Sequence, residues 1–101
     1  MAREYPIPIP MDAIAEFCRR NHIRKLSLFG SVLRDDFGPE SDVDVLVEFE
    51  PGKTPGFEFV DMMDELGELL GRPVDLVTPK FFRESLREKI QSDAEVLYVA
   101  A

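Results

Sequence analysis

The apolar residues in the first half of the chain follow helical spacing first and then form two strand-like runs. Ile14, Phe17 and Cys18 recur at helical intervals, which predicts an amphipathic helix. Two short apolar runs follow, separated by a segment rich in turn residues, and each run predicts a β-strand. The elements expected here are an extended segment (1–10), a helix (11–21), a strand (25–29), a short helical turn (31–35), a loop (37–41) and a strand (43–49).

A strongly amphipathic segment opens the second half of the chain. Residues 57–70 carry an apolar stripe and an acidic stripe, which predicts a helix that Gly71 ends. The apolar stripe is Phe59, Val60, Met63, Leu66 and Leu70, and the acidic stripe is Glu58, Asp61, Asp64, Glu65 and Glu68. The acidic stripe is interpreted most simply as a solvated face, and a basic partner surface stays open as the alternative.

The remaining residues predict a strand, a helix and a last strand. A short apolar run at 74–77 indicates a strand, and Thr78–Pro79 is typical of a helix start, here over 79–91. That helix is expected to bury Phe82, Leu86 and Ile90 and to turn a basic side (Lys80, Arg83, Arg87 and Lys89) to solvent. Contact of this basic side with a nucleotide or a partner stays open as the alternative. An edge strand is expected at 95–99. The fold class is therefore α/β (α+β), a small mixed β-sheet with helices packed on it, in one domain over residues 1–101.

The net charge and the cysteine content limit the expected cellular compartment and the expected binding partners. The net charge of −8 argues against tight nonspecific binding to nucleic acid, because that binding depends on Lys and Arg at the phosphates. The same charge suits divalent cations or a basic protein. Cys18 is the only cysteine, so no internal disulfide forms and a reducing cytoplasm is expected. With no secretory signal and no apolar run of membrane-spanning length, we expect a cytoplasmic protein without a membrane partner.

The candidate chemistry lies at the junction of the first two strands. The first strand ends in Gly30-Ser31, where backbone N–H groups at the start of a helical turn favour anions. Ten residues later the second strand opens with Asp42-Val43-Asp44, and residues i and i+2 of a strand share a face. Two crowded carboxylates repel each other unless a cation such as Mg²⁺ lies between them. Asp75 stands alone in the 74–77 strand, which we predict to be central and buried, where an unpaired charge is costly.

Simpler interpretations remain open for each of these residues. Asp42 and Asp44 are alternatively solvated residues at a strand entrance. Asp75 is alternatively the partner of Arg72 or Lys80 in a structural ion pair. Arg34 is alternatively a surface or ion-pair residue. Cys18 and His22 are interpreted as structural or incidental, since no zinc-ligand spacing, Walker A motif or serine-hydrolase elbow occurs.

The glycine-serine turn, the ten-residue gap, the Asp42-Val43-Asp44 pair and the later Asp75 together resemble a known superfamily. The pattern is similar to that of the nucleotidyltransferases typified by DNA polymerase beta. In length and local pattern it resembles their minimal members, the MntA-like antitoxins. The resemblance covers most of the chain, from about Ile14 to the final helix, and it implies the nucleotidyltransferase (polymerase beta palm-like) fold.

The resemblance implies a role for each matching residue. Gly30 and Ser31 would hold the β- and γ-phosphates of a nucleoside triphosphate, and Arg34 would neutralise phosphate charge. Asp42 and Asp44 would bind Mg²⁺. Asp75 would bind a second Mg²⁺ and help to deprotonate the acceptor hydroxyl. Asp35 stands where many relatives carry glycine, and its negative charge there would weaken nucleotide binding.

The resemblance also implies a function and a partner. The leading hypothesis is an antitoxin that transfers AMP from ATP to a tyrosine hydroxyl of a HEPN-domain RNase toxin. Two alternatives stay open. One is a binding module that blocks its toxin sterically, and the other is a small-molecule nucleotidyltransferase of the antibiotic-modifying type, for which a homo-oligomer would build the acceptor pocket. A template-directed polymerase is least consistent with the acidity of the chain.

Overall fold

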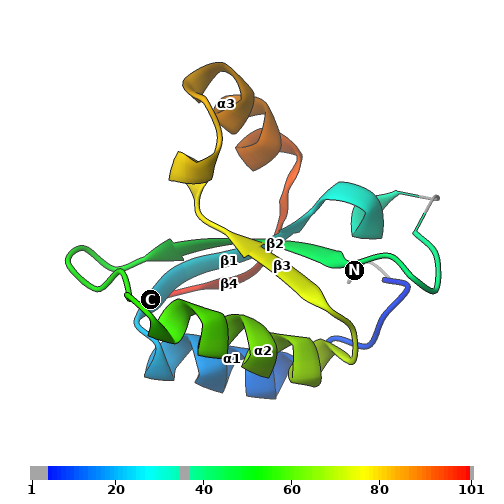
Figure 1. Ribbon diagram of the computed structural model, residues 1–101, viewed down its shortest axis with the longest axis horizontal. Helices are drawn as coiled ribbons and strands as arrows, with labels where there is room; N and C mark the ends of the chain where they lie inside the picture. Colours follow the sequence, from blue (N-terminus) through cyan, green and yellow to red (C-terminus); the bar gives the residue numbers. More distant parts are fainter. Residues whose placement is uncertain (1–4, 35–36, 101) are drawn as a thin grey trace.

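Helices and strands occur along the chain in the order that its apolar pattern predicts. The computed structural model describes residues 5–34 and 37–100. The elements are α1 (Met11–Arg20), β1 (Ile23–Phe29), the 3-10 turn η1 (Gly30–Leu33), β2 (Val43–Phe49), α2 (Glu58–Leu70), β3 (Val74–Val77), the 3-10 turn η2 (Pro79–Phe81), α3 (Glu84–Asp93) and β4 (Glu95–Val99). Figure 1 shows the mixed sheet with helices packed on it that the sequence predicts.

The four-stranded sheet has the order β3-β2-β1-β4 (Figure 1). β1 runs antiparallel to both of its neighbours, whereas β2 and β3 run parallel, with α2 as the crossover between them. β4 is an edge strand, as predicted. The prediction that residues 74–77 form a central strand is wrong, because β3 lies at the opposite edge. Strand order depends on the crossover path, which a local apolar run does not encode.

One face of the sheet forms the core beneath α1 and α2 (Figure 1). Val43, Val45 and Val47 of β2 point into it and are each 0% exposed, as is Phe17 of α1. Burying an aliphatic or aromatic side chain of this kind contributes roughly 1.5–3 kcal/mol. Because alternate residues of a strand face opposite sides, these valines fix the direction of Asp44, which must face away from the helical layer.

Helix α2 confirms the predicted amphipathic helix with one change in its buried face. Leu66 and Leu70 are buried as predicted, but Met62 is buried as well and Val60 is 57% exposed. The inward face therefore runs through Met62 and Leu66, at an interval of four residues, and Val60 lies outside it. Gly71 ends the helix in the left-handed conformation, with φ of +70°.

The segment after β3 departs from its prediction. A continuous helix over 79–91 is expected, but the chain forms η2, becomes extended at Phe82, and only then enters α3. The Phe82 ring packs edge-on against Phe29 of β1, with ring centroids 5.8 Å apart, which holds this residue to the sheet and out of the helix. None of the residues of α3 is buried, and Leu86 is 44% exposed.

Arg87 stabilises this break in the helix. The prediction that it faces solvent is wrong. Its Nε donates to the Pro79 carbonyl at 2.8 Å, and its Nη2 donates to the Phe82 carbonyl at 3.0 Å. Both carbonyls lie between β3 and α3, and the Pro79 carbonyl also accepts the Phe82 N–H at 3.2 Å, so the guanidinium ties this interrupted segment to α3. Thr78 makes no side-chain cap hydrogen bond.

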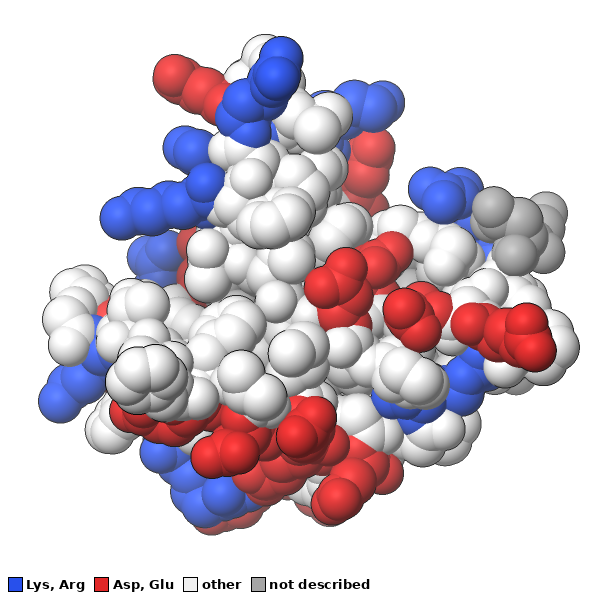
Figure 2. Space-filling model, viewed as in Figure 1, with Lys and Arg blue, Asp and Glu red and all other residues white. Residues whose placement is uncertain are grey.

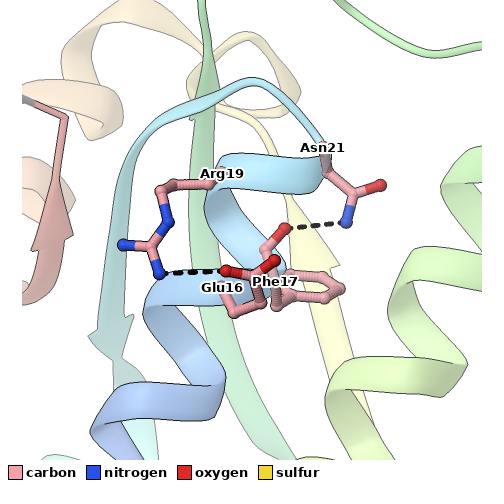
Figure 3. Close-up of polar contacts among 4 residues, drawn as sticks. All are labelled: Glu16, Phe17, Arg19 and Asn21. Carbon is pink, nitrogen blue, oxygen red and sulfur yellow. Dashed lines mark hydrogen bonds and ion pairs between the residues drawn. The ribbon is translucent and has the colours of Figure 1, made fainter.

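Helix α1 ends in a side-chain cap that starts the turn into β1 (Figure 3). The Asn21 side-chain amide donates to the Phe17 carbonyl at 2.8 Å. His22, the next residue, has φ of +56°, which reverses the chain. Arg19 and Glu16 form an exposed ion pair at 3.0 Å on the same helix, and pairs of this kind contribute about 0–1 kcal/mol.

Acidic and basic side chains gather over different elements. Figure 2 shows Asp and Glu as the more numerous charged residues over the layer formed by α1 and α2, and Lys and Arg as the more prominent ones around α3. Within the acidic stripe of α2, Glu65 accepts a hydrogen bond from Arg20 of α1, so this part of the stripe is paired within the chain. In the described ranges, none of the helices combines the length and apolarity needed to cross a membrane.

Candidate active site

β1 ends in a glycine turn that lies directly against β2. Gly30 has φ of +76°, a left-handed conformation that glycine adopts without strain. A Cβ atom at this position would overlap the Asp44 carboxylate and would lie 3.1 Å from its Cγ. The turn is closed by the Arg34 N–H, which donates to the Ser31 carbonyl at 2.9 Å. The turn and Asp44 therefore form one packed unit.

Asp44 lies at the centre of the candidate residues. It is paired in register with Phe29 of β1 and with Asp75 of β3. Burial raises the pKa of its carboxyl above the ordinary value of 3.8, and the negative charges of Asp75 and Asp42 raise the pKa further. A backbone hydrogen bond from Ser31 and the charge of Arg34 lower it. The interpretation of Asp44 as a simply solvated residue does not fit this environment.

Asp42 and Asp75 flank Asp44 and are both exposed. Asp42 directly precedes β2, and Asp75 lies beside Asp44 on the edge strand β3. The prediction that Asp75 is buried is wrong, because an edge strand leaves this side chain open to solvent. Within the part of the chain that the structure describes, Asp75 forms no ion pair with Arg72 or Lys80, so the structural ion-pair alternative has no support.

The structure brings the predicted glycine, serine, arginine and aspartates to one corner of the sheet. Ser31 is half-buried in η1, and its backbone N–H lies close enough to the Asp44 carboxylate to lower the pKa of that group. Arg34 is exposed at the end of the turn, close enough for its charge to act on Asp44. The prediction concerning Asp35 lies outside the described residues.

Arg72 positions the loop before Asp42, a role that sequence reasoning missed. Its guanidinium donates to the Gly38 and Ser41 carbonyls, each at 2.7 Å, and lies 4.7 Å from the centre of the Phe37 ring. The Ser41 hydroxyl oxygen accepts a hydrogen bond from the Gly38 N–H at 2.9 Å. The sequence shows only an arginine just before β3. Its carbonyl partners, Gly38 and Ser41, lie 34 and 31 residues earlier in the chain, so local sequence does not reveal them.

The side chains at this corner have the donor chemistry of a site for a hard divalent cation. Asp42, Asp44 and Asp75 supply carboxylate oxygens, which Mg²⁺ prefers. Burial is the main cause of the raised pKa of Asp44, and a cation would relieve the repulsion from Asp75 and Asp42 that raises this pKa further. Across residues 5–34 and 37–100, no three or more His, Cys, Asp or Glu side chains converge as metal ligands do. Binding a cation would therefore require these carboxylates to turn toward one another.

Comparison with known proteins identifies the family to which this chain belongs. Residues 11–97 match the nucleotidyltransferase domain family. The protein adenylyltransferase MntA of Thermococcus cleftensis is 34% identical over 85 residues, which cover 83% of this chain and 82% of that protein. The chain therefore belongs to the nucleotidyltransferase domain family, and it is a nucleotidyltransferase.

Solved structures show the same fold. A minimal nucleotidyltransferase aligns with a TM-score of 0.70 and 33% identity, covering 83% of this chain and 85% of that one. A toxin-antitoxin structure with AMP-PNP aligns with a TM-score of 0.71 at 20% identity, covering 90% and 74% of the two chains. The complex of a tri-AMPylated Shewanella oneidensis HEPN toxin with an MNT antitoxin aligns with a TM-score of 0.63 at 21% identity, covering 89% and 70%. The last two likenesses, at this identity, concern the fold alone.

Proposed function

We propose that this protein is an antitoxin that transfers AMP from ATP to a tyrosine hydroxyl of a HEPN-domain RNase toxin, with Mg²⁺ as cofactor. The adenylyltransferase named among the relatives supports the reaction, and the HEPN complex of a structural relative supports the partner. AMP-PNP in a second structural relative supports a nucleotide substrate. The observation that carries the proposal is the packing of Asp44 against the Gly30 turn, with Asp42 and Asp75 on either side.

Each residue of the corner has a role in this reaction. Gly30 and Ser31 receive the β- and γ-phosphates on the backbone of η1, and Arg34 neutralises part of their charge. Asp42, Asp44 and Asp75 hold Mg²⁺, which supplies stabilisation of the attacking and leaving oxygens.

The bond changes follow from in-line attack. The acceptor oxygen forms a bond to the α-phosphorus while the bond to the bridging oxygen breaks, and pyrophosphate leaves. The proton of the acceptor hydroxyl passes to the Asp75 carboxylate. The exposure of Asp75 on an edge strand suits a macromolecular acceptor, because a side chain presented by another protein can approach it without entering a closed cavity.

Neutralisation of the toxin tests this proposal against a purely steric antitoxin. A HEPN-domain RNase from the same host would be expressed with wild type, with the Asp42→Asn/Asp44→Asn variant, or with Asp64→Asn as a control that changes an exposed carboxylate of α2. We expect growth with wild type and with the control, and toxicity with the double variant despite equal expression. Growth with the double variant would contradict the enzymatic function and indicate steric inhibition.

A further inference from the structure

A long groove follows the open edge of the sheet between β3 and α2. Its two parts, with volumes of about 680 and 440 Å³, share Met63 of α2 as a lining residue. One part reaches Arg72 at the turn into β3, and the other passes Asp75 and includes Phe81 of η2. In the sheet that the described residues form, β3 is an edge strand, so its outer backbone groups have no neighbouring strand to bond with. The groove therefore offers an open strand edge beside one of the candidate site's carboxylates.

The surface along this groove exposes large apolar side chains. Phe81 is 72% exposed and lines the groove together with Phe59 and Met63 of α2. Val60 is 57% exposed and lies one helical turn before Met63, and Phe57, one turn before Val60, is 99% exposed. Figure 2 shows mainly uncharged surface over β3 and η2, with acidic side chains along its margins. Contiguous apolar surface with a polar rim marks an interaction site, whereas scattered apolar residues do not.

The charges around the groove select between its possible occupants. α2 carries five acidic residues and no basic one, and Asp64 and Asp75 line the groove itself. Among the basic lining residues, Arg72 donates to two loop carbonyls, while Lys80 is exposed. A second copy of this chain, with its net charge of −8, would bring two acidic rims together. A protein with an apolar centre and basic residues around it is the complementary partner.

We propose that this groove binds the acceptor protein, through an extended segment that adds a strand to β3. In this arrangement an apolar side chain of the segment fills the space beside Met63 and Phe81, flanking basic residues face the acidic side of α2, and the acceptor hydroxyl lies next to Asp75. The assignment rests on the proposed function, since it takes a protein hydroxyl as the acceptor. It also gives a role to the exposed apolar side chains Val60 and Phe81, which the core does not use.

The affinity for a HEPN-domain RNase from the same host, measured by calorimetry without nucleotide, tests this docking surface. Val60→Lys would be compared with Val99→Lys, because Val99 is 60% exposed on β4 at the opposite edge of the sheet. Phe81→Ala removes an apolar side chain without adding charge. We expect about tenfold weaker RNase binding in Val60→Lys and Phe81→Ala and no change in Val99→Lys. ATP binding and the thermal unfolding midpoint should stay close to those of wild type in all three variants.

Hydrogen exchange tests the added strand. When the RNase binds, backbone N–H groups of β3 (Val74–Val77) should exchange more slowly, because an added strand accepts hydrogen bonds from this edge. Those of the opposite edge strand β4 (Glu95–Val99) should exchange as before. Unchanged exchange in β3, or protection of β4 instead, would overturn the strand addition.

The other outcomes separate this surface from the proposed function. RNase binding that neither Val60→Lys nor Phe81→Ala weakens, with AMP transfer by wild type intact, would overturn the docking surface alone. RNase binding that both variants weaken, without AMP transfer by wild type, would support the docking surface and overturn the transfer reaction. Wild type that does not bind the RNase would overturn both proposals. A dimer of this chain that Phe81→Ala dissociates would assign the groove to a second copy and overturn the docking surface too.

Discussion

Gly30 and Asp44 share a space that has no room for a side chain at position 30. The Asp44 carboxylate occupies the position that a Cβ atom would take, and the φ of +76° at Gly30 adds backbone strain for any other residue. The first two strands are therefore joined at the candidate site by a contact that depends on glycine. Most of the testable consequences of the structure follow from this corner.

Substituting Gly30 should damage the site more than it damages the fold. Gly30→Ala introduces left-handed strain of roughly 1–2 kcal/mol and also displaces the Asp44 carboxylate. Gly52→Ala is a matched control, because Gly52 has φ of +77° and nothing within 4 Å of its Cβ position. We expect the two variants to lose similar amounts of folding stability from backbone strain. Only Gly30→Ala should also lose AMP transfer, by about a hundredfold or more. Equal activities of the two variants would contradict the contact described here.

The crowding of carboxylates should be visible in the titration of Asp44. In the metal-free protein its pKa lies above 3.8, first because of burial and then because of Asp75 and Asp42. Asp75→Asn removes one negative neighbour, so the pKa of Asp44 should fall, while Asp61→Asn on α2 should leave it unchanged. A carbon-detected NMR titration of the Asp44 carboxyl measures this directly. A pKa that does not move in Asp75→Asn would show that the two side chains are not coupled.

The raised pKa of Asp44 should make the stability of the protein depend on pH in a defined direction. Between the ordinary pKa and the raised one, the folded protein binds more protons than the unfolded chain. The contribution of Asp44 to the free energy of unfolding is thus present below pH 3.8 and is lost as pH rises through the raised pKa. Asp44→Asn should remove this contribution and flatten the pH dependence of stability, measured by denaturant titration at several pH values. Unaltered pH dependence in the variant would argue against the raised pKa.

Arg72 should affect catalysis through the position of Asp42. Arg72→Met keeps much of the apolar stem but removes the hydrogen bonds to the Gly38 and Ser41 carbonyls, which we expect to cost about 1–3 kcal/mol of stability. Because the loop leads into Asp42, kcat should fall more than KM for ATP rises. Arg20→Met, which breaks the exposed pair with Glu65, is the control and should cost about 1 kcal/mol or less. A change in KM alone would indicate that Arg72 acts on the nucleotide instead.

Cys18 should behave as an inert core residue. It is 0% exposed, and burial raises the pKa of its thiol from 9.0 to about 12. The native protein should therefore react with Ellman's reagent only through unfolding, and the reaction should become fast in denaturant. Its stabilising contribution is fully present below pH 9.0 and is lost as pH rises toward about 12, because the unfolded thiol ionises first. Rapid reaction of the native thiol would contradict the burial.

The sequence predicts well those parts of the fold in which local periodicity and burial coincide. β2 has the predicted bounds, because Val43, Val45 and Val47 alternate without interruption and all face the helices. The place of Asp75 could not be predicted in this way. Its strand is apolar enough to be read as central, but the strand order of the sheet is set by the crossover through α2.

Long-range side-chain contacts account for the rest. The break before α3 follows from Phe82 packing on Phe29, and the loop before Asp42 is held by Arg72. Neither contact leaves a periodic signal, because each joins segments far apart in the sequence. Of the candidate site, the glycine turn and the aspartates were predictable from their spacing, whereas the positioning role of Arg72 and the groove beside β3 were not.

The fate of the α-phosphate tests the central claim most directly. The purified protein would be incubated with Mg²⁺, a HEPN-domain RNase from the same host, and ATP labelled at either the α- or the γ-phosphate, with the Asp42→Asn/Asp44→Asn variant in parallel. We expect label on the RNase from α-labelled ATP alone, at a tyrosine located by mass spectrometry, and none with the variant. Label from γ-labelled ATP, equal labelling by the variant, or no label on the RNase would contradict the account.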